Sequence, residues 1–130
     1  MGGRDELHAA AVAARARAHA PYSQFAVGAA IRTASGRIFS GCNVENAAYP
    51  EGWCAETTAI GQMIMAGEAE IAEVAVVAEG ERLCTPCGGC RQRLAEFGKP
   101  DVPVHVGDPR SIRKSFSLGE LLPAAFELKE

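Results

Sequence analysis

The chain has 130 residues, of which 48% are hydrophobic and 22% charged, and its formal net charge is −3. That length is typical of one domain with a buried core, and we interpret residues 1–130 as a single domain. The acidic balance, without a basic stripe interleaved with aromatic residues, argues against a nucleic-acid partner.

The sequence also argues against membrane and export roles. No apolar run approaches the roughly 20 residues of a spanning helix. The segment from Met1 to Glu6 lacks the basic and apolar regions of a secretory signal. The five cysteines are an odd number, and clustered cysteines without an export signal more often bind metal or perform chemistry than form disulfides. We therefore predict a cytoplasmic protein with no membrane partner.

The first third of the chain predicts a helix followed by a hairpin. Residues 4–20 are rich in alanine, and Pro21 ends the helical pattern. Two short apolar runs, at 25–33 and 38–43, flank a tight connection containing Gly36. This arrangement is typical of two antiparallel strands.

The rest of the chain alternates helical and strand patterns. We predict helices at 54–66 and 87–97, strands at 74–78 and 102–106, a short strand near 115–117 and a short helix ending at Leu122. Alternation favours parallel strands joined by right-handed crossovers, and the early hairpin adds antiparallel ones. The predicted fold class is α/β, a three-layer α-β-α sandwich with a mixed five-stranded sheet.

Two short cysteine motifs carry the chemistry. Cys54, Cys87 and Cys90 lie where a loop becomes a predicted helix, and unpaired N–H groups at a helix start stabilise thiolates. Zinc held by three protein ligands keeps a fourth position for water, which is the catalytic arrangement. Glu56 follows Cys54 by two residues, so it is placed to act as a general base. We therefore predict a zinc hydrolase acting on a small molecule.

Other uses of the cysteines are open at this point. Cys84, Cys87 and Cys90 form a C-x2-C-x2-C run that is similar to the start of an iron–sulfur motif, but Leu94 occupies the place of the fourth ligand. A closed structural zinc site would have four cysteine ligands, namely Cys54, Cys84, Cys87 and Cys90. That alternative leaves the glutamate without a role, so we interpret Cys84 as a small buried residue at a strand end.

The motifs resemble the zinc site of the small homotetrameric cytidine deaminases. The resemblance rests on Cys54-Ala55-Glu56 and on Pro86-Cys87-Gly88-Gly89-Cys90-Arg91-Gln92. It extends to further segments along the chain, namely Pro21-Tyr22-Ser23, Phe25-Ala26-Val27-Gly28-Ala29-Ala30, Gly41-Cys42-Asn43-Val44-Glu45-Asn46, Tyr49-Pro50 and Glu120-Leu121-Leu122-Pro123.

The resemblance implies a cytidine deaminase-like fold and hydrolytic deamination of cytidine and deoxycytidine to uridine and deoxyuridine, in pyrimidine salvage. It implies one zinc ion per subunit and a homotetramer with active sites completed by neighbouring subunits. Glu56 would move protons to the pyrimidine. The backbone of Ala55 would contact the base, and Asn43 and Glu45 would hold the ribose 3′-hydroxyl, a pairing that amide and carboxylate groups favour.

The resemblance also implies aromatic contacts. Phe25 would line the pocket for sugar and base, Phe126 would pack on the base from a neighbouring subunit, and Tyr49 would reach from another. Phe25 and Phe126 equally fit a core or interface role, and we interpret Tyr49 as nearer to a structural residue. Without the resemblance, Asn43 and Glu45 would be interpreted as the cap of a turn, and the resemblance favours the functional role.

One residue departs from the family pattern. The family commonly has an arginine directly after the glutamate, where it hydrogen-bonds the cysteine sulfurs, and this chain has Thr57. Helix N–H groups, with Arg91 or Arg93 nearby, are our hypothesis for a replacement.

Three rival functions follow from the same residues. The first is a deaminase of the same fold acting on another small aminopyrimidine nucleoside or a nucleoside antibiotic. The second is a non-catalytic, zinc-stabilised binding module. The third is a polynucleotide deaminase. The acidic balance and the expected binding of the 3′-hydroxyl by Asn43 and Glu45 argue against it, because a bound 3′-hydroxyl leaves no room for a continuing strand.

Overall fold

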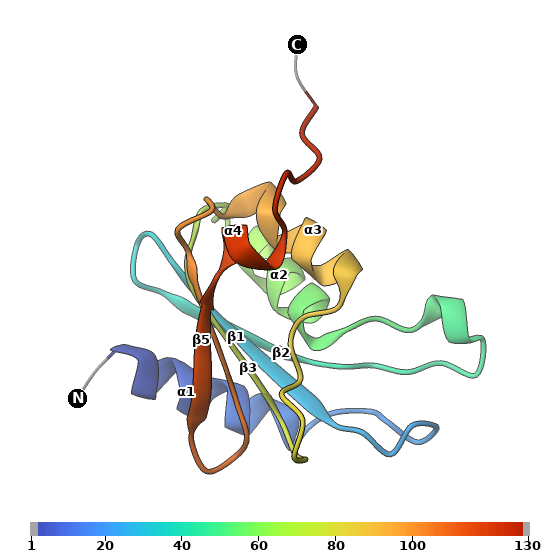
Figure 1. The fold of residues 1–130 in the computed structure, drawn as a ribbon. Coiled ribbons are helices and arrows are strands. Elements are labelled where there is room, and N and C mark those ends of the chain that lie inside the picture. Colours follow the sequence, from blue (N-terminus) through green and yellow to red (C-terminus); the bar gives the residue numbers. More distant parts are fainter. Residues whose placement is uncertain (1–2, 129–130) are drawn as a thin grey trace.

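The computed structural model describes residues 3–128, which fold around a mixed five-stranded sheet (Figure 1). In chain order the elements are α1 (Gly3–Arg15), β1 (Val27–Thr33), β2 (Ile38–Cys42), the 3-10 turn η1 (Tyr49–Glu51), α2 (Ala55–Met65), β3 (Ile71–Ala78), α3 (Gly88–Phe97), β4 (Pro103–Gly107), β5 (Ile112–Ser117) and α4 (Leu118–Leu121). Within residues 3–128 no helix has both the length and the apolar composition needed to cross a membrane.

The strand order across the sheet is β2-β1-β3-β4-β5. β1 pairs antiparallel with both β2 and β3, whereas β3 and β4 are parallel and connected through α3. β5 returns antiparallel to β4. The predicted hairpin and the predicted parallel pair are therefore both confirmed.

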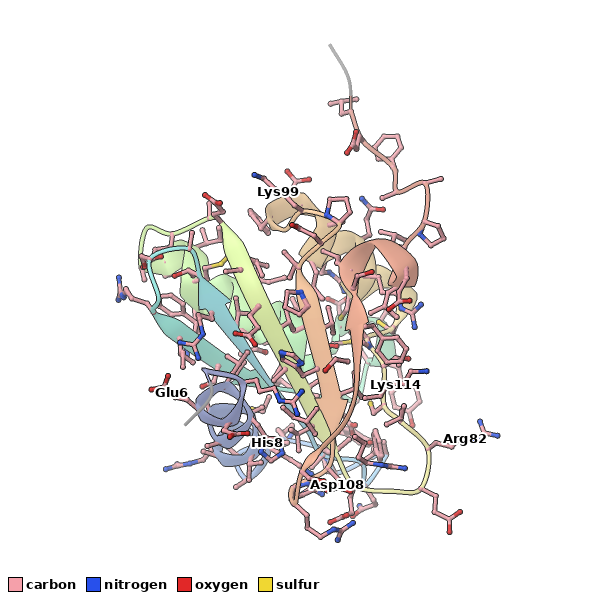
Figure 2. The ribbon with its side chains drawn as sticks, turned by 60° about the vertical axis from the view of Figure 1, so that its left-hand side comes forward. Glu6, His8, Arg82, Lys99, Asp108 and Lys114 are labelled. Atoms are coloured by element: carbon pink, nitrogen blue, oxygen red, sulfur yellow. The ribbon has the colours of Figure 1, made fainter. Side chains whose placement is uncertain are left out.

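Helices cover both faces of the sheet, as the three-layer prediction requires. On one face α1 packs Leu7 and Ala11 against side chains of β1 and β3, and Figure 2 shows this helix against the strands. On the other face α2, α3 and α4 enclose a larger cluster that includes Met63 and Leu94. Successive strand residues point to opposite faces, so neighbours such as Ala75 and Val76 enter different clusters.

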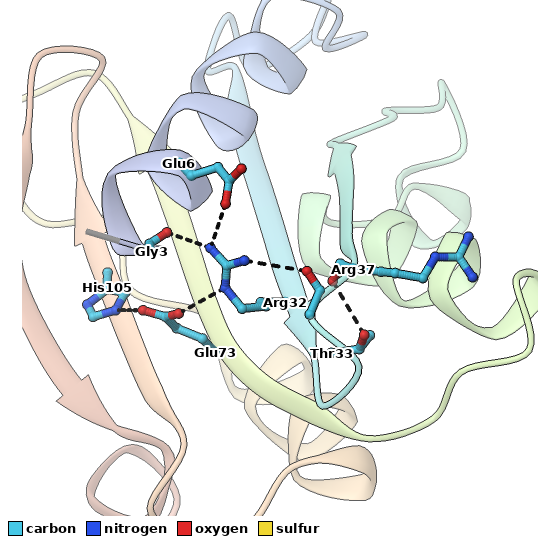
Figure 3. A network of polar contacts seen from close by, with 8 residues as sticks. Gly3, Glu6, Arg32, Thr33, Arg37, Glu73 and His105 are labelled. Atoms are coloured by element: carbon cyan, nitrogen blue, oxygen red, sulfur yellow. Dashed lines mark hydrogen bonds and ion pairs between the residues drawn. The ribbon is translucent and has the colours of Figure 1, made fainter. Parts of the chain in front are cut away.

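A polar network joins the start of α1 to three strands (Figure 3). The guanidinium of Arg32 on β1 donates to the Gly3 carbonyl at 2.6 Å and pairs with Glu6 and Glu73, each at 3.3 Å. Glu73 in turn contacts Nε2 of the buried His105 at 2.6 Å. The network links α1 to β1 through Arg32, and β1 to β3 and β4 through Glu73.

The first helix ends at Arg15, earlier than the sequence predicts. The segment after it pairs with a distant one: the His19 N–H donates to the Asn43 carbonyl at 3.0 Å, and the Glu45 N–H donates to the His19 carbonyl at 2.8 Å. β1 likewise begins at Val27 and not at residue 25. The Asn43 side chain accepts a hydrogen bond from the Val27 N–H and donates one to the Phe25 carbonyl just before the strand.

Gly41 on β2 sets the position of the helix that carries Glu56. A Cβ at Gly41 would lie 2.5 Å from the backbone nitrogen of Ala59 and 2.7 Å from the carbonyl of Ala55, both in α2. We expect Gly41→Ala to lower the free energy of unfolding by about 1–3 kcal/mol, because α2 must move outward. Chemical denaturation measures the loss.

Gly61 on the exposed side of α2 offers the matched control. A Cβ there meets nothing within 4 Å, and alanine in a helix interior is more favourable than glycine by about 1 kcal/mol. Gly61→Ala should therefore raise the free energy of unfolding. Equal unfolding free energies for the Gly41→Ala and unmodified proteins would contradict the close packing of α2 on β2.

Candidate active site

Three cysteine sulfurs converge where two helices begin. Cys54 caps the start of α2, Cys87 caps the start of α3, and Cys90 lies in the first turn of α3. Their Sγ atoms all lie within 4.8 Å of one another, and those of Cys54 and Cys87 are 3.8 Å apart. Two sulfurs bound at about 2.3 Å to a tetrahedral zinc ion are separated by about 3.8 Å. The three cysteines therefore fit zinc.

The environment of the cluster favours a thiolate at Cys54. A hydrogen bond from the Cys90 thiol lowers the pKa of Cys54 to about 6, and the same bond raises the pKa of Cys90. Cys54 and Cys87 occupy the N-cap positions of α2 and α3, and the positive end of a helix dipole stabilises negative sulfur there. Thiolate is the form of cysteine that binds metal.

Glu56 lies beside the cluster in the first turn of α2. Glu56 is 4% exposed to solvent, and this burial raises the pKa of its carboxyl to about 7. A group with a pKa near the working pH can both accept and release a proton, which is what a general acid–base needs. Such a shift at a cavity wall is typical of a functional site.

A cavity of about 530 Å³ opens in front of Glu56. The volume is within the range for small-molecule sites, roughly 300–1,000 Å³. Its lining residues come from the loop after α1, from β1 and the segment after β2, from the start of α2 and from the loop before α3: Tyr22, Ser23, Val27, Asn43, Val44, Glu45, Asn46, Tyr49, Gly52, Trp53, Cys54, Ala55, Glu56, Cys84, Thr85 and Cys87.

Two long connections form the outer wall of the cavity. Val44 and Trp53 exchange two backbone hydrogen bonds of 3.0 Å each, which closes the segment containing η1 into a loop. The loop extends past the sheet edge beside the connection between α1 and β1 (Figure 1). The rings of Tyr22 and Tyr49 meet edge to face at 6.0 Å and join the two connections.

Asn43 and Glu45 organise this wall. The Asn43 side chain accepts from the Val27 N–H and donates to the Phe25 carbonyl, both at 2.9 Å.

The Glu45 carboxylate accepts hydrogen bonds from the backbone N–H groups of Tyr22 and Ser23, each at 3.0 Å, and from the Ser23 hydroxyl. These bonds, led by the one from the Ser23 hydroxyl, lower the pKa of Glu45. Glu45 is therefore ionised at neutral pH.

The predicted site residues do not all meet in this cavity. Cys90 lies in the metal cluster behind it, and seven others line it, namely Asn43, Glu45, Tyr49, Cys54, Ala55, Glu56 and Cys87. Phe25 and Phe126 are outside the lining, and they are 42% and 72% exposed. The exposed ring of Phe126 agrees with a contact made outside its own chain.

Cys84 has a different position from the one the sequence suggests. It is only partly buried and lines the cavity, and burial raises the pKa of its thiol to about 11. Among residues 3–128, the cysteine triplet that converges contains Cys54 in place of Cys84. The iron–sulfur run and the four-cysteine site therefore do not form. A single sequence gives no signal for the place of Cys84 in the cavity.

Arg91 holds the loop that leads into Cys87. Its guanidinium donates to the carbonyl of Pro86 at 2.7 Å, to the hydroxyl of Thr85 at 3.0 Å and to the carbonyl of Leu121 at 2.9 Å. The cysteine loop is thereby fastened to the end of α4. All three bonds go to oxygen, so Arg91 has a structural role here and does not contact the sulfurs.

Three cysteines at two helix starts, with a buried glutamate facing a cavity, define a catalytic zinc site of the hydrolytic class. Residues 2–106 match the family described as the cytidine and deoxycytidylate deaminase zinc-binding region. The chain therefore belongs to the cytidine and deoxycytidylate deaminase zinc-binding family.

Individual relatives agree over nearly the whole chain. Cytidine deaminase from Sporosarcina psychrophila is 39% identical over 126 residues, covering 97% of this chain and 93% of that protein. The crystal structure of cytidine deaminase from Burkholderia pseudomallei superposes with a TM-score of 0.90 at 45% identity, covering 97% of this chain and 100% of that one. That from Mycobacterium tuberculosis gives a TM-score of 0.84 at 38% identity, covering 98% and 100%.

Proposed function

We propose that this protein is a zinc-dependent cytidine deaminase, a single catalytic domain over residues 1–130. Water and cytidine or deoxycytidine are converted to ammonia and uridine or deoxyuridine. The observation that carries the proposal is the position of Glu56, whose buried carboxyl faces a nucleoside-sized cavity beside three clustered cysteines. The names of the relatives support this substrate class.

The three cysteines and Glu56 have separate roles in the proposed reaction. Cys54, Cys87 and Cys90 would hold the metal, and zinc when bound would supply an activated water at neutral pH. Glu56 would accept one proton from the attacking water and deliver it to N3 of the pyrimidine, and would then accept a second proton, from the new hydroxyl at C4, and deliver it to the amine, which leaves as ammonia. The raised pKa of Glu56, about 7, suits a group that accepts and then releases protons near neutral pH.

The cavity wall supplies the contacts for the nucleoside. The backbone of Ala55 borders the cavity where the base would lie, and Asn43 and Glu45 border it where the ribose would lie. Each of the two side chains keeps unused hydrogen-bonding capacity after its bonds within the protein, because an amide or carboxylate can make about four. We assign the ribose 3′-hydroxyl to Asn43 and Glu45.

Replacing Glu45 by Gln should weaken the use of cytidine. A hydrogen bond to a charged group contributes about 1.5–3 kcal/mol, so kcat/KM should fall roughly 10- to 100-fold. The same variant should act on 3′-deoxycytidine as the unmodified enzyme does, because that substrate lacks the hydroxyl. Initial rates with both nucleosides measure the difference.

Ser23→Ala controls for loosening of the wall. It removes a hydroxyl that Glu45 binds and leaves the carboxylate in place. We expect Ser23→Ala to reduce kcat/KM equally for the two nucleosides. If Glu45→Gln also lowers kcat/KM by the same factor for both nucleosides, Glu45 supports the cavity wall and does not hold the 3′-hydroxyl.

We also propose a homotetramer in which neighbouring subunits complete each active site through Phe126 and Tyr49. Large apolar side chains on the surface of the described chain support this assembly, among them Met65 at 87% exposure and Tyr49 at 75%. Light scattering on the zinc-loaded protein reports the subunit number. The cytoplasmic location stays a prediction.

Absorbance of the pyrimidine ring tests the proposed activity. The protein is incubated with cytidine, deoxycytidine and cytosine, and the loss of the aminopyrimidine band is followed, with Glu56→Gln as the control. Turnover of the nucleosides by the unmodified protein alone supports the proposal. No turnover of any of them by protein carrying stoichiometric zinc would overturn the nucleoside assignment and favour another small aminopyrimidine substrate or a binding module.

A further inference from the structure

The cysteine cluster needs a positive charge beside it. Three thiolates and a divalent zinc ion sum to one negative charge, and the carboxyl of Glu56 lies next to them. Cys90 is fully buried, so water contributes least to stabilising its sulfur. Buried charge without a partner is costly.

Arg93 supplies a charged donor to that sulfur. Its Nη1 lies 3.7 Å from the Sγ of Cys90, within hydrogen-bonding distance for sulfur. The two residues are three apart on α3, so their side chains share one face of the helix. Gly89 leaves room for the guanidinium, because a Cβ at that position would lie 3.2 Å from Nη1.

The neighbouring polar groups do not take this role. Arg91 is occupied by three oxygen acceptors. Thr57 is neutral, and its hydroxyl lies 4.0 Å from the Cys90 sulfur. Within residues 3–128 no carboxylate lies within ion-pair distance of Arg93, so its charge is available to the sulfur.

We propose that Arg93 is a positioning residue that offsets the charge of the three thiolates through Cys90 and so adjusts how strongly they donate to zinc. The proposal rests on the proposed function for its effect on turnover, but its effect on the sulfurs is independent of the substrate.

Replacing zinc by cobalt allows the bonding of the thiolates to the metal to be followed by absorption spectroscopy. Charge transfer from thiolate to Co²⁺ gives an absorption band whose energy rises when a cation stabilises the sulfur electrons. We expect Arg93→Gln to move this band to longer wavelength and Arg93→Lys to return it toward the original position. In the zinc enzyme, Arg93→Gln should lower kcat about tenfold with KM unchanged, at the low end of the effects known for residues behind metal ligands because Arg93 is exposed.

Two variants serve as controls. Arg82→Gln makes the same change in net charge at a side chain that projects into solvent (Figure 2), and it should leave the band in place. Thr57→Val removes the weaker hydroxyl and should move the band less than Arg93→Gln does. A cobalt band in Arg93→Gln identical to that of the unmodified protein overturns the proposal, whatever happens to activity. Because the band needs no substrate, failure of the deaminase assignment leaves this result readable.

Discussion

Glu56→Gln is expected to lower kcat for cytidine roughly 10²- to 10⁴-fold, the usual contribution of a general acid–base. The amide keeps the size of the side chain but can neither accept nor return the proton. Zinc content should stay at one ion per chain, because the cysteine cluster does not include Glu56. Steady-state rates and metal analysis of the same preparation measure both quantities.

The stability of this variant separates lost chemistry from lost structure. The Glu56 carboxyl has an ordinary pKa of 4.5 and a pKa of about 7 in the folded chain. The folded state therefore binds the proton more tightly, and the favourable contribution is lost as the pH rises from 4.5 through 7. A neutral glutamine avoids this loss, so metal-free Glu56→Gln should melt at pH 8 no lower than the unmodified chain. A clearly lower melting temperature would mean that the variant damages the fold.

Cys87→Ala is expected to remove both zinc and activity. Two remaining thiolates cannot hold zinc in the three-ligand arrangement that a catalytic site uses. Bound zinc should fall from one per chain to a small fraction, and the fall in kcat should be at least as large as that of Glu56→Gln, roughly 10²- to 10⁴-fold. Metal analysis after gel filtration and the absorbance assay measure the two losses.

Cys84→Ala is the matched control. Cys84 lines the same cavity but lies outside the converging triplet. Stoichiometric zinc in Cys84→Ala and its absence in Cys87→Ala are the expected pair of results. Loss of zinc from Cys84→Ala would instead indicate a closed site with four cysteines and no position for water.

The helix starts that carry the site could be predicted from sequence because they depend on local chemistry. The second helix, expected at 54–66, runs over Ala55–Met65, and the third, expected at 87–97, runs over Gly88–Phe97. Cysteines spaced by three residues and followed by a helical pattern place two sulfurs on one turn. The third sulfur joins them through a parallel crossover, which the alternation of elements also indicated.

The ends of elements that pair with residues far away in the sequence are predicted less accurately. The first helix stops at Arg15 because the segment after it pairs with residues around Asn43. β5 extends over Ile112–Ser117, longer than its sequence pattern suggests, because it pairs along β4. The sequence likewise could not predict which of Arg91 and Arg93 contacts a cysteine sulfur. Both lie within one turn of Cys90, and their different partners are set by the surrounding chain.

Titration of zinc into metal-free protein measures whether deamination depends on zinc. Cytidine deamination is measured after each addition, alongside bound metal. We expect activity to rise linearly and to stop rising at one zinc ion per chain, in keeping with the single three-cysteine cluster of residues 3–128. Full activity before zinc is added, or no activity with one ion bound, would contradict a zinc-dependent cytidine deaminase.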